Sequence, residues 1–356
     1  MKYKILVINP GSTSTKIAVY EDEQPVFQKT LRHSTAEIEQ FPTVPSQYSF
    51  RKETILKELA DAGISINDLN AVIGRGGVVK PVESGVYEVN DALKNDLNHS
   101  RMGQHASNLG GLIADDIARM IPNARAFIAD PVVVDELDDV ARITGHPLLP
   151  HQSIFHALNQ KAIARKFAKD TGRRYEDLNL IVAHLGGGIS IGAHRKGRII
   201  DVNNALNGYG PFSPERAGTL PAFQLAELCF SGNYTIDEVR AMITGKGGLV
   251  AHIGINDVQD ACKRANEGDA NIARVLKAMA YGIAKAIGSA YAVLKGKTDG
   301  ILLTGGIAYN DLVVKEIVEH IESFGIVVIY PGEDEMGALA MNALGVLKGE
   351  MQCKVY

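Results

Sequence analysis

The sequence has few cysteines and no long apolar run. Its three cysteines, Cys229, Cys262 and Cys353, lie far apart and form no Cys-x-x-Cys pair, which argues against a disulfide framework and against a zinc cluster. No apolar stretch approaches the roughly 18 residues that suggest a membrane-spanning helix. The strand-like segment at residues 4–8 is too short for the apolar core of a signal peptide. We therefore expect a soluble, cytoplasmic protein with no membrane partner.

An excess of charge of one sign is absent as well. Lys and Arg number 37 and Asp and Glu number 41, so the formal net charge is −4, and both signs are interspersed. A protein that coats nucleic acid or lies on a membrane surface needs a basic face, so we expect no nucleic-acid partner. With 46% hydrophobic residues among 356, the chain can form the cores of two ordinary domains.

Several well-known catalytic and nucleotide-binding motifs are missing. Gly296–Thr298 matches the end of a P-loop, but Tyr291 stands where that motif requires glycine. The glycines Gly186, Gly188 and Gly192 miss the G-x-G-x-x-G spacing by one position, and a strand-like segment follows them instead of a helix. An H-E-x-x-H metal motif does not occur either.

The segment Leu180–Ala205 is the most informative stretch that is present. It predicts a buried strand over residues 180–183, three consecutive glycines at 186–188, and a hairpin formed by residues 189–194 and 198–202. Three glycines in a row expose backbone N–H groups and permit positive φ angles, so an anionic group can approach the main chain closely. An ordinary hairpin softened by glycines is the alternative interpretation.

The same pattern occurs near the beginning of the chain. Residues 5–11 fall on residues 180–186 after a shift of 175 positions (184 − 9), which places Asn9 on His184. In both copies a buried strand ends in a polar residue and a glycine-containing loop, and a β-hairpin follows. An internal repeat predicts two similarly folded halves, whose loops could face each other across a cleft. Strand–glycine–strand is a common pattern, so a chance match is the alternative.

Strand-like and helix-like segments alternate along the rest of the chain. Helices are predicted at residues 53–62, 154–169, 271–294 and 311–324. Asn108 is a candidate N-cap for a further helix that extends to Met120. Buried strands are predicted at residues 71–73, 86–89, 126–129, 301–304 and 326–330. This alternation predicts an α/β protein whose sheets are covered by helices.

Polar residues or glycines directly follow several predicted strands: Asn9, Arg75, Asp130, His184 and Gly305–Gly306. Side chains at the carboxyl ends of strands in α/β sheets converge on the ligand-binding crevice. Arg75 and Arg216 each lie in a glycine-rich loop, and a guanidinium fork suits phosphate oxygens. Each arginine alone is explained as a solvated loop residue. Together with two glycine-rich loops and a carboxylate, they indicate a phosphoryl-transfer site.

Eight short motifs, in order along the chain, resemble the acetate/butyrate kinase family of the actin-like ATPase superfamily. They are Val7–Lys16 (VINPGSTSTK), Arg75–Val78 (RGGV), His105–Leu109 (HASNL), Ile128–Pro131 (IADP), Phe155–Lys161 (FHALNQK), His184–Ser190 (HLGGGIS), Glu215–Gly218 (ERAG) and Thr304–Ile307 (TGGI). The match extends over essentially the whole chain. Its length and residues 210–221 (GPFSPERAGTLP) resemble the butyrate-specific branch more than the acetate-specific branch.

The resemblance implies a duplicated actin-like ATPase (ribonuclease H-like) fold, with two domains around a cleft. The first domain would comprise residues 1–151 and 337–356. The second would comprise residues 152–336 and carry most of the nucleotide site. The implied reaction is reversible in-line phosphoryl transfer from ATP to a short-chain fatty acid, giving an acyl phosphate and ADP, with Mg²⁺ as cofactor. Butyrate is the expected acid, and acetate, propionate and branched acids are the alternatives. Family members generally self-associate, so the resemblance implies a homo-oligomer, a dimer or a multiple of one.

The resemblance also implies a set of catalytic residues. They are Arg75, Arg216, His156, Asp130 and Asn9. The two arginines would bind the carboxylate and the phosphoryl group in transfer, and His156 would form a hydrogen bond to that group. His105 would lie near the substrate, with a packed histidine at a helix start as its alternative role.

A magnesium site and a nucleotide site are implied as well. Asp130 and Glu335 would hold the magnesium ion, directly or through water, with Asn9 beside them. Glu333 lies close by in the sequence and is the alternative to Glu335. The residues expected to bind the nucleotide are Lys16, Ser12, Ser14, His184, Gly186, Gly187, Gly188, Gly305 and Gly306.

An enzyme of this kind needs no general base, because a carboxylate is already ionised at neutral pH. The sequence accordingly shows no obvious pair of base and nucleophile. A non-catalytic actin-like ATP sensor is the interpretation from another class. Such a protein would keep the two glycine loops but would have no need of Arg75, Arg216 and His156 together. Their joint presence favours the enzyme.

Overall fold

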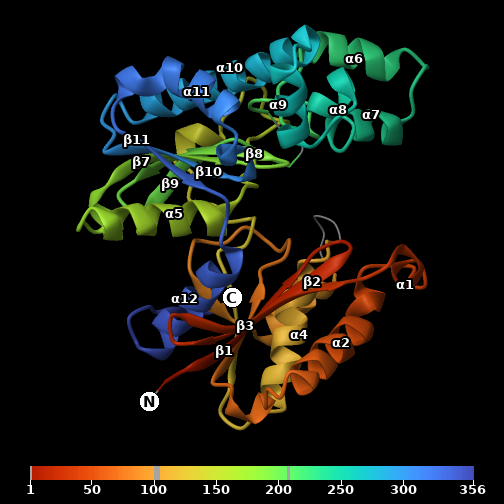
Figure 1. Cartoon of the computed structure of the whole chain (residues 1–356), viewed down its shortest axis with the longest axis vertical. Coiled ribbons are helices and arrows are strands. Elements are labelled where there is room, and N and C mark those ends of the chain that lie inside the picture. The colour runs from red at the N-terminus through yellow and green to blue at the C-terminus, as the bar shows by residue number, and fades with distance from the viewer. Residues whose placement is uncertain (1, 100–104, 207–208) are drawn as a thin grey trace. The chain divides into compact units, whose positions relative to one another are not determined.

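The computed structural model describes residues 2–99, 105–206 and 209–356 (Figure 1). The chain divides into two units: residues 1–134 together with 334–356 form the first, and residues 135–333 form the second. These boundaries differ from the expected 151/152 and 336/337. The segment after Val134 belongs to the second unit because Asp138 donates its backbone N–H to Ile200 at 2.9 Å. The Glu136 carboxylate also accepts from the Lys161 ammonium at 2.7 Å.

The first unit is built on a seven-stranded sheet with the order β12-β5-β6-β4-β1-β2-β3. Its strands are β1 (Lys4–Pro10), β2 (Ser14–Glu21), β3 (Gln24–Arg32), β4 (Ala71–Arg75), β5 (Val86–Glu88), β6 (Arg125–Ala129) and β12 (Cys353–Lys354). β1 pairs antiparallel with β2 and parallel with β4, and β4 pairs parallel with β6. The carboxyl ends of β1, β4 and β6 therefore meet along one edge of the sheet.

Helices cover both faces of this sheet (Figure 1). They are α2 (Tyr48–Asp61), α3 (Asp91–Asn98), α4 (Asn108–Arg119) and α12 (Glu335–Leu347), whereas the short helix α1 (Thr35–Ile38) buries no residue. Leu6 and Ile8 of β1 share one core with Ile55 of α2 and Ile113 of α4. Because side chains alternate along a strand, the intervening residues of β1 face the other side, where α12 packs against β1 and β4.

The second unit is built on a five-stranded sheet with the order β11-β10-β7-β8-β9. Its strands are β7 (Asn179–Leu185), β8 (Ile189–Arg195), β9 (Arg198–Val202), β10 (Gly300–Gly305) and β11 (Val327–Pro331). β7 pairs antiparallel with β8 and parallel with β10, and β10 pairs parallel with β11. The carboxyl ends of β7 and β10 thus lie side by side.

Helices also cover both faces of the second sheet (Figure 1). One face is covered by α5 (Ala157–Asp170) and the other by α10 (Ala270–Val293), against which α8 (Gly248–Ile253), α9 (Val258–Asn266) and α11 (Asp311–Ile321) pack. The unit also contains α6 (Ala222–Phe230) and α7 (Ile236–Ile243). Ile181 of β7 packs with Met279 of α10 on one face, and Leu180 packs with Phe167 of α5 on the other. Across the described ranges, no helix combines the length and the apolar character that crossing a bilayer requires.

The two sheets repeat one arrangement of strands. The neighbours β6-β4-β1-β2-β3 correspond to β11-β10-β7-β8-β9, with the same relative strand directions. β1 and β7 begin 175 positions apart, at Lys4 and Asn179, and β2 and β8 begin 175 positions apart, at Ser14 and Ile189. The internal repeat and the α/β architecture predicted from the sequence are confirmed.

The predicted N-cap of α4 is wrong by one residue. Ser107 occupies the N-cap position. The Asn108 side chain instead accepts the N–H of Val78 at 2.8 Å and donates to the carbonyl oxygen of Leu97 at 3.2 Å. A buried asparagine can satisfy distant backbone groups as well as a helix end, and local spacing does not distinguish the two uses.

Candidate functional site

Three candidate residues of the first unit form a cluster at the carboxyl edge of its sheet. Asn9 lies at the end of β1, Arg75 ends β4, and Glu335 begins α12. Glu335 accepts from Arg75 through both carboxylate oxygens, at 3.0 and 3.2 Å, and from the Asn9 amide at 2.6 Å. Because a bidentate arginine–carboxylate pair is geometrically defined, the cluster holds a guanidinium and a carboxylate in fixed directions where α/β sheets bind ligands.

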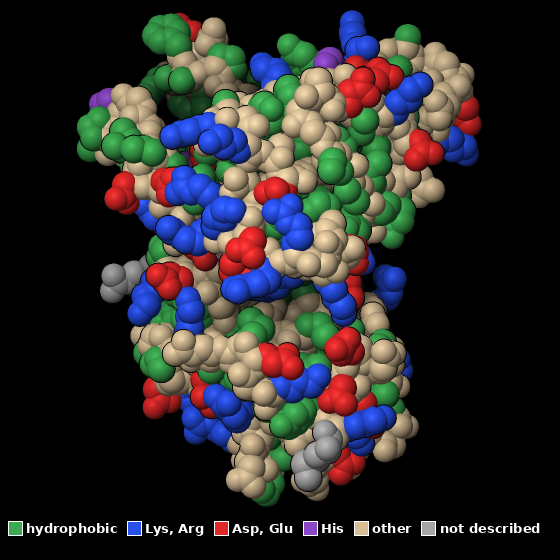
Figure 2. Space-filling view, turned by 90° about the vertical axis from the view of Figure 1, so that its left-hand side faces the viewer, with side chains coloured by type: hydrophobic (Ala, Val, Ile, Leu, Met, Phe, Trp, Pro, Cys, Tyr) green, Lys and Arg blue, Asp and Glu red, His purple; other side chains and the backbone are tan. Residues whose placement is uncertain are grey.

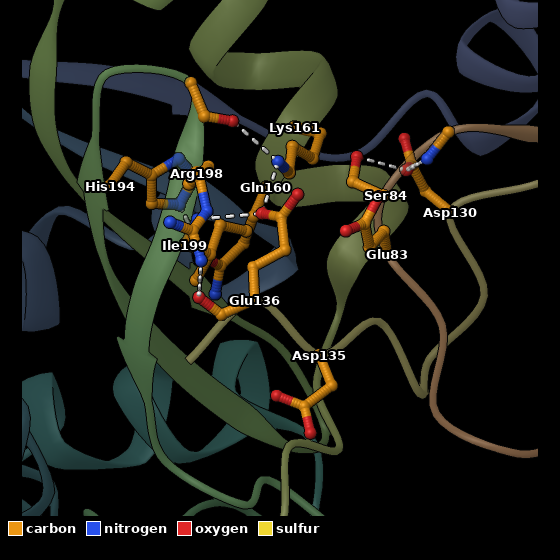
Figure 3. A network of polar contacts seen from close by, with 12 residues as sticks. Glu83, Ser84, Asp130, Asp135, Glu136, Gln160, Lys161, His194, Arg198 and Ile199 are labelled. Carbon is orange, nitrogen blue, oxygen red and sulfur yellow. Dashed lines mark hydrogen bonds and ion pairs between the residues drawn. The ribbon is translucent and has the colours of Figure 1, made fainter. Parts of the chain in front are cut away.

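Asp130 directly follows β6 at the same sheet edge, with a positive φ of 37°. Such a backbone angle is uncommon for a residue other than glycine and is found at functional sites more often than elsewhere. One carboxylate oxygen, Oδ1, accepts from the Ser84 hydroxyl at 2.6 Å and from the Gly85 N–H at 2.8 Å (Figure 3). These two bonds fix the direction of the carboxylate.

The loop between β1 and β2 is held by a residue that sequence analysis missed. Arg51 of α2 is fully buried, and burial lowers the pKa of its guanidinium. The guanidinium donates to the backbone oxygens of Gly11, Ser12 and Ser14, at 2.9, 2.9 and 3.0 Å. Arg51 thereby fixes the loop that carries Ser12 and Ser14. Nothing in the sequence marks it, because an arginine on a helix normally faces solvent.

Lys16 lies beside this loop on β2. It is directly opposite Asn9 in the antiparallel ladder, and residues in that relation project on the same face of a sheet. Ser14 and Lys16 also line a cavity of about 640 Å³ together with Arg32 and His33. The structure thus places two of the expected nucleotide-binding side chains on one open, basic surface of the first unit.

Two candidate histidines stack in the second unit. The rings of His156, which precedes α5, and His184, near the end of β7, have centroids 4.0 Å apart and planes at 21°. The Glu333 carboxylate lies 3.5 Å from His184 and accepts from the Asn159 amide at 3.1 Å. Glu333 is therefore associated with the histidines. Glu335, in the other unit, is associated with Arg75 and Asn9.

The triple-glycine loop follows β7 as expected, but the positive φ angles that its glycines permit are not adopted. None of the residues Gly186, Gly187 and Gly188 has a positive φ, and Gly186 donates its N–H to Gly188 at 3.1 Å. A Cβ atom at 188 would overlap the guanidinium of Arg216, so this position of the arginine depends on glycine at 188. Gly188 allows the guanidinium of Arg216 to lie close to the loop backbone, and the N–H of Gly186 is already used within the loop.

Arg216 is half-buried beside this loop. Its guanidinium donates to the backbone oxygen of Ala205. Burial lowers the pKa of Arg216, the neighbouring Glu215 acts in the opposite direction, and an arginine remains charged at neutral pH. A partly desolvated guanidinium attracts an anion more strongly than one in bulk water.

Gly305 ends β10 and Gly306 follows it, beside the end of β7. Gly305 has a φ of 91°, and a Cβ atom there would overlap the backbone oxygen of Leu185. Glycine is therefore required for both the backbone angle and the strand approach. A Cβ atom at Gly306 would have open space around it.

His105 lies at the surface just before α4. Its Nδ1 accepts the backbone N–H of Ser107 at 3.2 Å and lies 2.8 Å from the Ser107 hydroxyl. This contact orients the exposed histidine ring at the helix start.

A further cavity, of about 560 Å³, lies between β8, β9 and α10 of the second unit. It is lined in part by Asp201, Tyr209 and Lys285, and by none of the candidate residues.

On the face drawn in Figure 2, Lys and Arg side chains are interspersed with Asp and Glu side chains. That face therefore offers no extended basic patch of the kind that nucleic acid requires.

Comparisons with known proteins identify relatives over the full length of the chain. It is 56% identical over 353 residues to a probable butyrate kinase from Bacteroides thetaiotaomicron, covering 99% of both chains. It is 55% identical over 356 residues to butyrate kinase 2 from Clostridium acetobutylicum, covering 100% of both.

Solved structures share the fold at much lower identity. The acetate kinase of Porphyromonas gingivalis superposes with a TM-score of 0.80 at 18% identity, covering 97% of this chain and all of the other. A propionate kinase from Francisella tularensis superposes with a TM-score of 0.76 at 18% identity, covering 96% and 98% of the two chains. The Acetokinase family matches residues 151–337, and with the full-length relatives this shows that the chain belongs to that family.

Proposed function

We propose that this protein transfers the γ-phosphoryl group of ATP to the carboxylate of a short-chain fatty acid, preferably butyrate, in a reversible reaction. The observation that carries the proposal is the identity of 56% and 55% to two proteins named as butyrate kinases, over essentially the whole chain. The geometry supports it, because two ordered clusters, Asn9–Arg75–Glu335 and His156–His184–Glu333, stand at the carboxyl ends of equivalent strands.

The substrate carboxylate is the nucleophile in this proposal. It is ionised at neutral pH, so no side chain has to remove a proton from it. The protein has to align the attacking oxygen, the phosphorus atom and the leaving oxygen, and to stabilise the charge on the equatorial phosphoryl oxygens. Arg75 and Arg216 supply positive charge for that task, the first held by Glu335 and the second by the Ala205 carbonyl oxygen.

Further hydrogen-bond donors complete the proposed site. His156 would donate a hydrogen bond to the transferring group. Ser12, Ser14 and Lys16 of the first unit, and Gly186–Gly188, His184 and Gly305–Gly306 of the second, would bind the nucleotide. The open space beside Gly306 supports an approach of the nucleotide to the backbone there. His105 would lie near the substrate, where its contact with Ser107 holds the ring.

Magnesium is the proposed cofactor, held by Asp130 and Glu335 with Asn9 beside them. These residues offer oxygen atoms, the donors that Mg²⁺ prefers, and Mg²⁺ characteristically keeps several waters and substrate oxygens as further ligands. The described residues contain no group of three His, Cys, Asp or Glu side chains that could hold a metal ion by themselves, which fits an ion bound largely by the nucleotide. When bound, Mg²⁺ supplies charge neutralisation of the phosphate oxygens.

Trapping of the acyl phosphate with hydroxylamine tests the proposal. The purified protein would be assayed with ATP, Mg²⁺ and unbranched and branched acids of two to five carbons. We expect hydroxamate formation with kcat/KM highest for butyrate. Two methylene groups at about 0.8 kcal/mol each favour butyrate over acetate by roughly tenfold.

Two outcomes would change this conclusion in different ways. A higher kcat/KM for acetate, propionate or a branched acid would keep the reaction and change the substrate. Tight ATP binding without hydroxamate formation from any acid would instead indicate a non-catalytic ATP sensor, for which the full arginine and histidine set would have no explanation.

We further propose that the protein works as a homo-oligomer, a dimer or a multiple of one, in the cytoplasm. Exposed apolar side chains in the second unit support self-association: Phe223 is 73% exposed, Phe230 91% and Ile236 63%. Contiguous exposed apolar surface is a feature of protein–protein interfaces. Sedimentation velocity at micromolar concentration would test the assembly, and a monomer would contradict it.

A further inference from the structure

A chain of buried hydrogen bonds leads from the interior of the second unit to His156. It runs through Tyr175, His194, Gln160 and Ser190, each bonded to the next by its side chain. Ser190, Gln160 and His194 have no exposed surface, and Tyr175 is 5% exposed. None of the four was singled out by sequence analysis as a site residue. Figure 3 shows Gln160 on α5 meeting His194 from the sheet.

The middle of this chain has only one possible arrangement of donors and acceptors. The nitrogen of the Gln160 amide faces the carbonyl oxygen of Ser190 at 3.1 Å, and a carbonyl oxygen can only accept. The amide nitrogen is therefore on the Ser190 side, where it also donates to the Ser190 hydroxyl oxygen at 2.8 Å. The amide oxygen then faces His194 at 3.0 Å, so the proton of this hydrogen bond is on Nε2 of His194.

The Tyr175 end of this series of hydrogen bonds agrees with the same assignment of donors and acceptors. Burial lowers the pKa of His194 well below the ordinary value, with a further effect of the Lys161 ammonium, so the ring is neutral. A neutral ring with its proton on Nε2 accepts at Nδ1, where the Tyr175 hydroxyl lies at 2.8 Å and donates. Every bond from Tyr175 to the Gln160 amide is then made with matched donors and acceptors.

The same reasoning fixes the contact with His156. The Ser190 hydroxyl oxygen accepts from Gln160, and its own proton needs an acceptor because the side chain is fully buried. Nδ1 of His156, at 2.9 Å, is the acceptor that the structure offers. A histidine that accepts at Nδ1 and is neutral carries its proton on Nε2.

We propose that Ser190 is a positioning residue that keeps the proton of the His156 ring on Nε2. Gln160, backed by His194 and Tyr175, holds the Ser190 hydroxyl in this role. The use of that Nε2–H as a donor to the transferring phosphoryl group rests on the proposed function. The state of the ring does not, and it can be measured without turnover.

Gly192 gives independent support for the arrangement. It lies on β8 between Ser190 and His194 and faces α5 with them. A Cβ atom at this position would overlap Oε1 of Gln160. Glycine is thus needed for the amide to reach between the two side chains that it connects, even though Gly192 itself takes no part in the hydrogen bonds.

Nitrogen NMR of the histidine rings tests the proposal in the full-length protein. Long-range ¹H–¹⁵N spectra of protein labelled at histidine distinguish a protonated from an unprotonated ring nitrogen. The signals of His156 are assigned as those lost in His156→Gln. At about pH 8, above the ordinary histidine pKa, we expect His156 of the wild type to have an unprotonated Nδ1 and a protonated Nε2.

Ser190→Ala removes the donor to Nδ1, so the His156 signals should move to values averaged between the two tautomers. Gly192→Ala should displace the Gln160 amide and shift the same signals in the same direction by less. The Gly192→Ala variant also keeps the test decisive if the Ser190→Ala variant does not fold. Ser289→Ala is the matched control, because it removes one serine hydrogen bond on α10, to Lys285 at 3.2 Å, outside the chain of contacts. This control should leave His156 unchanged.

A wild type with the proton on Nδ1 of His156 would overturn the proposal. An unchanged tautomer in both Ser190→Ala and Gly192→Ala would also overturn it. In the acyl-phosphate assay, Ser190→Ala should lower kcat on the order of tenfold with little change in KM, the size of effect seen when a group that orients a functional histidine is lost. If His156→Gln had normal turnover, the role given to His156 under the proposed function would fail, while the ring measurement would still decide whether Ser190 sets its tautomer.

Discussion

The two sheets carry equivalent strands, yet the loop after the first strand of each is stabilised in a different way. In the first unit, the loop after β1 is held by hydrogen bonds from the buried guanidinium of Arg51 to three of its backbone oxygens. In the second unit, the backbone oxygen of Gly187 in the loop after β7 accepts from the Ser213 hydroxyl at 2.6 Å, and the absence of a Cβ atom at Gly188 makes room for Arg216.

This difference shows which features the two copies of the fold share and which features differ between them. Strand order, strand direction and the 175-residue offset are kept because they are determined by backbone pairing and by alternating burial. The side chains around the loops are not constrained in that way. The first unit has charged partners there, Arg75 and Glu335, and the second has stacked histidines and a half-buried arginine.

The largest effect is expected from removing the buried arginine of the first unit. Arg51→Met leaves three backbone oxygens of the loop without their donor, at about 1 kcal/mol or more each, so the free energy of unfolding should fall by about 3 kcal/mol or more. Urea unfolding followed by circular dichroism measures this, since the chain has no tryptophan to report by fluorescence.

Hydrogen exchange shows whether the damage of Arg51→Met is confined to one unit. Protection should be lost at residues 4–21 and kept at residues 179–195. Lys52→Met is the control, because its partially exposed pair with Asp116 is worth less than about 1 kcal/mol. Equal loss of protection in both segments would contradict the separate support of the two loops.

The next effect is on catalysis. Arg75→Ala and Arg216→Ala should each lower kcat on the order of 10²-fold, the usual result of removing a preorganised electrostatic donor, while thermal stability changes little. Different losses of kcat in the two variants would sharpen the comparison between the units, because Glu335 neutralises part of the charge of Arg75. Near-normal turnover in either variant would remove that arginine from the site.

A matched pair of glycine variants tests the difference between the loops directly. Gly188→Ala should displace Arg216, whose guanidinium a Cβ atom would overlap, and lower kcat on the order of tenfold. Gly11→Ala should have little effect, because the nearest atoms to a Cβ there belong to Ser14 at 3.6 Å, an ordinary contact distance. Similar turnover for the two variants would mean that the loops are equivalent after all.

The smallest effect concerns the pH dependence of stability. Burial lowers the pKa of His194 well below 6.5 and also lowers the pKa of His33, where Arg51 adds to the effect and Glu37 opposes it. Near pH 6.5 the unfolded chain takes up a proton at each ring before the folded protein does, so the free energy of unfolding falls as the pH is lowered.

His194→Gln and His33→Gln should each reduce this slope between about pH 5 and 7, by at most one proton per site. Urea unfolding at a series of pH values measures it. A slope that is the same in both variants as in the wild type would contradict the neutral, buried state of the rings.

Much of the fold could be predicted from local patterns. The strand, glycine and hairpin pattern at residues 5–11 and 180–186 predicted the repeat that the sheets confirm, because buried strands leave runs of apolar residues that are visible without a structure. The long helix α10, predicted at 271–294 and observed at Ala270–Val293, has its buried residues from Ile272 to Ala290 at helical spacing.

The supporting side chains could not be predicted, because their role depends on distant contacts. Arg51 and Gln160 lie on helices whose sequences are compatible with solvent exposure, yet both are fully buried. Glu333 and Glu335 are two positions apart but belong to different units. The segment after Val134 belongs to the second unit, where Glu136 pairs with Lys161, a contact that no spacing rule indicates.

The central claim is that the fatty acid's own carboxylate attacks the phosphorus atom, while the protein only positions and stabilises the groups. The stereochemistry of transfer from ATP made chiral at the γ-phosphorus with oxygen isotopes tests this most directly. A single in-line attack predicts that the configuration at phosphorus is inverted in butanoyl phosphate. Retention would contradict the account, because it would require an intermediate in which a side chain of the protein itself carries the phosphoryl group.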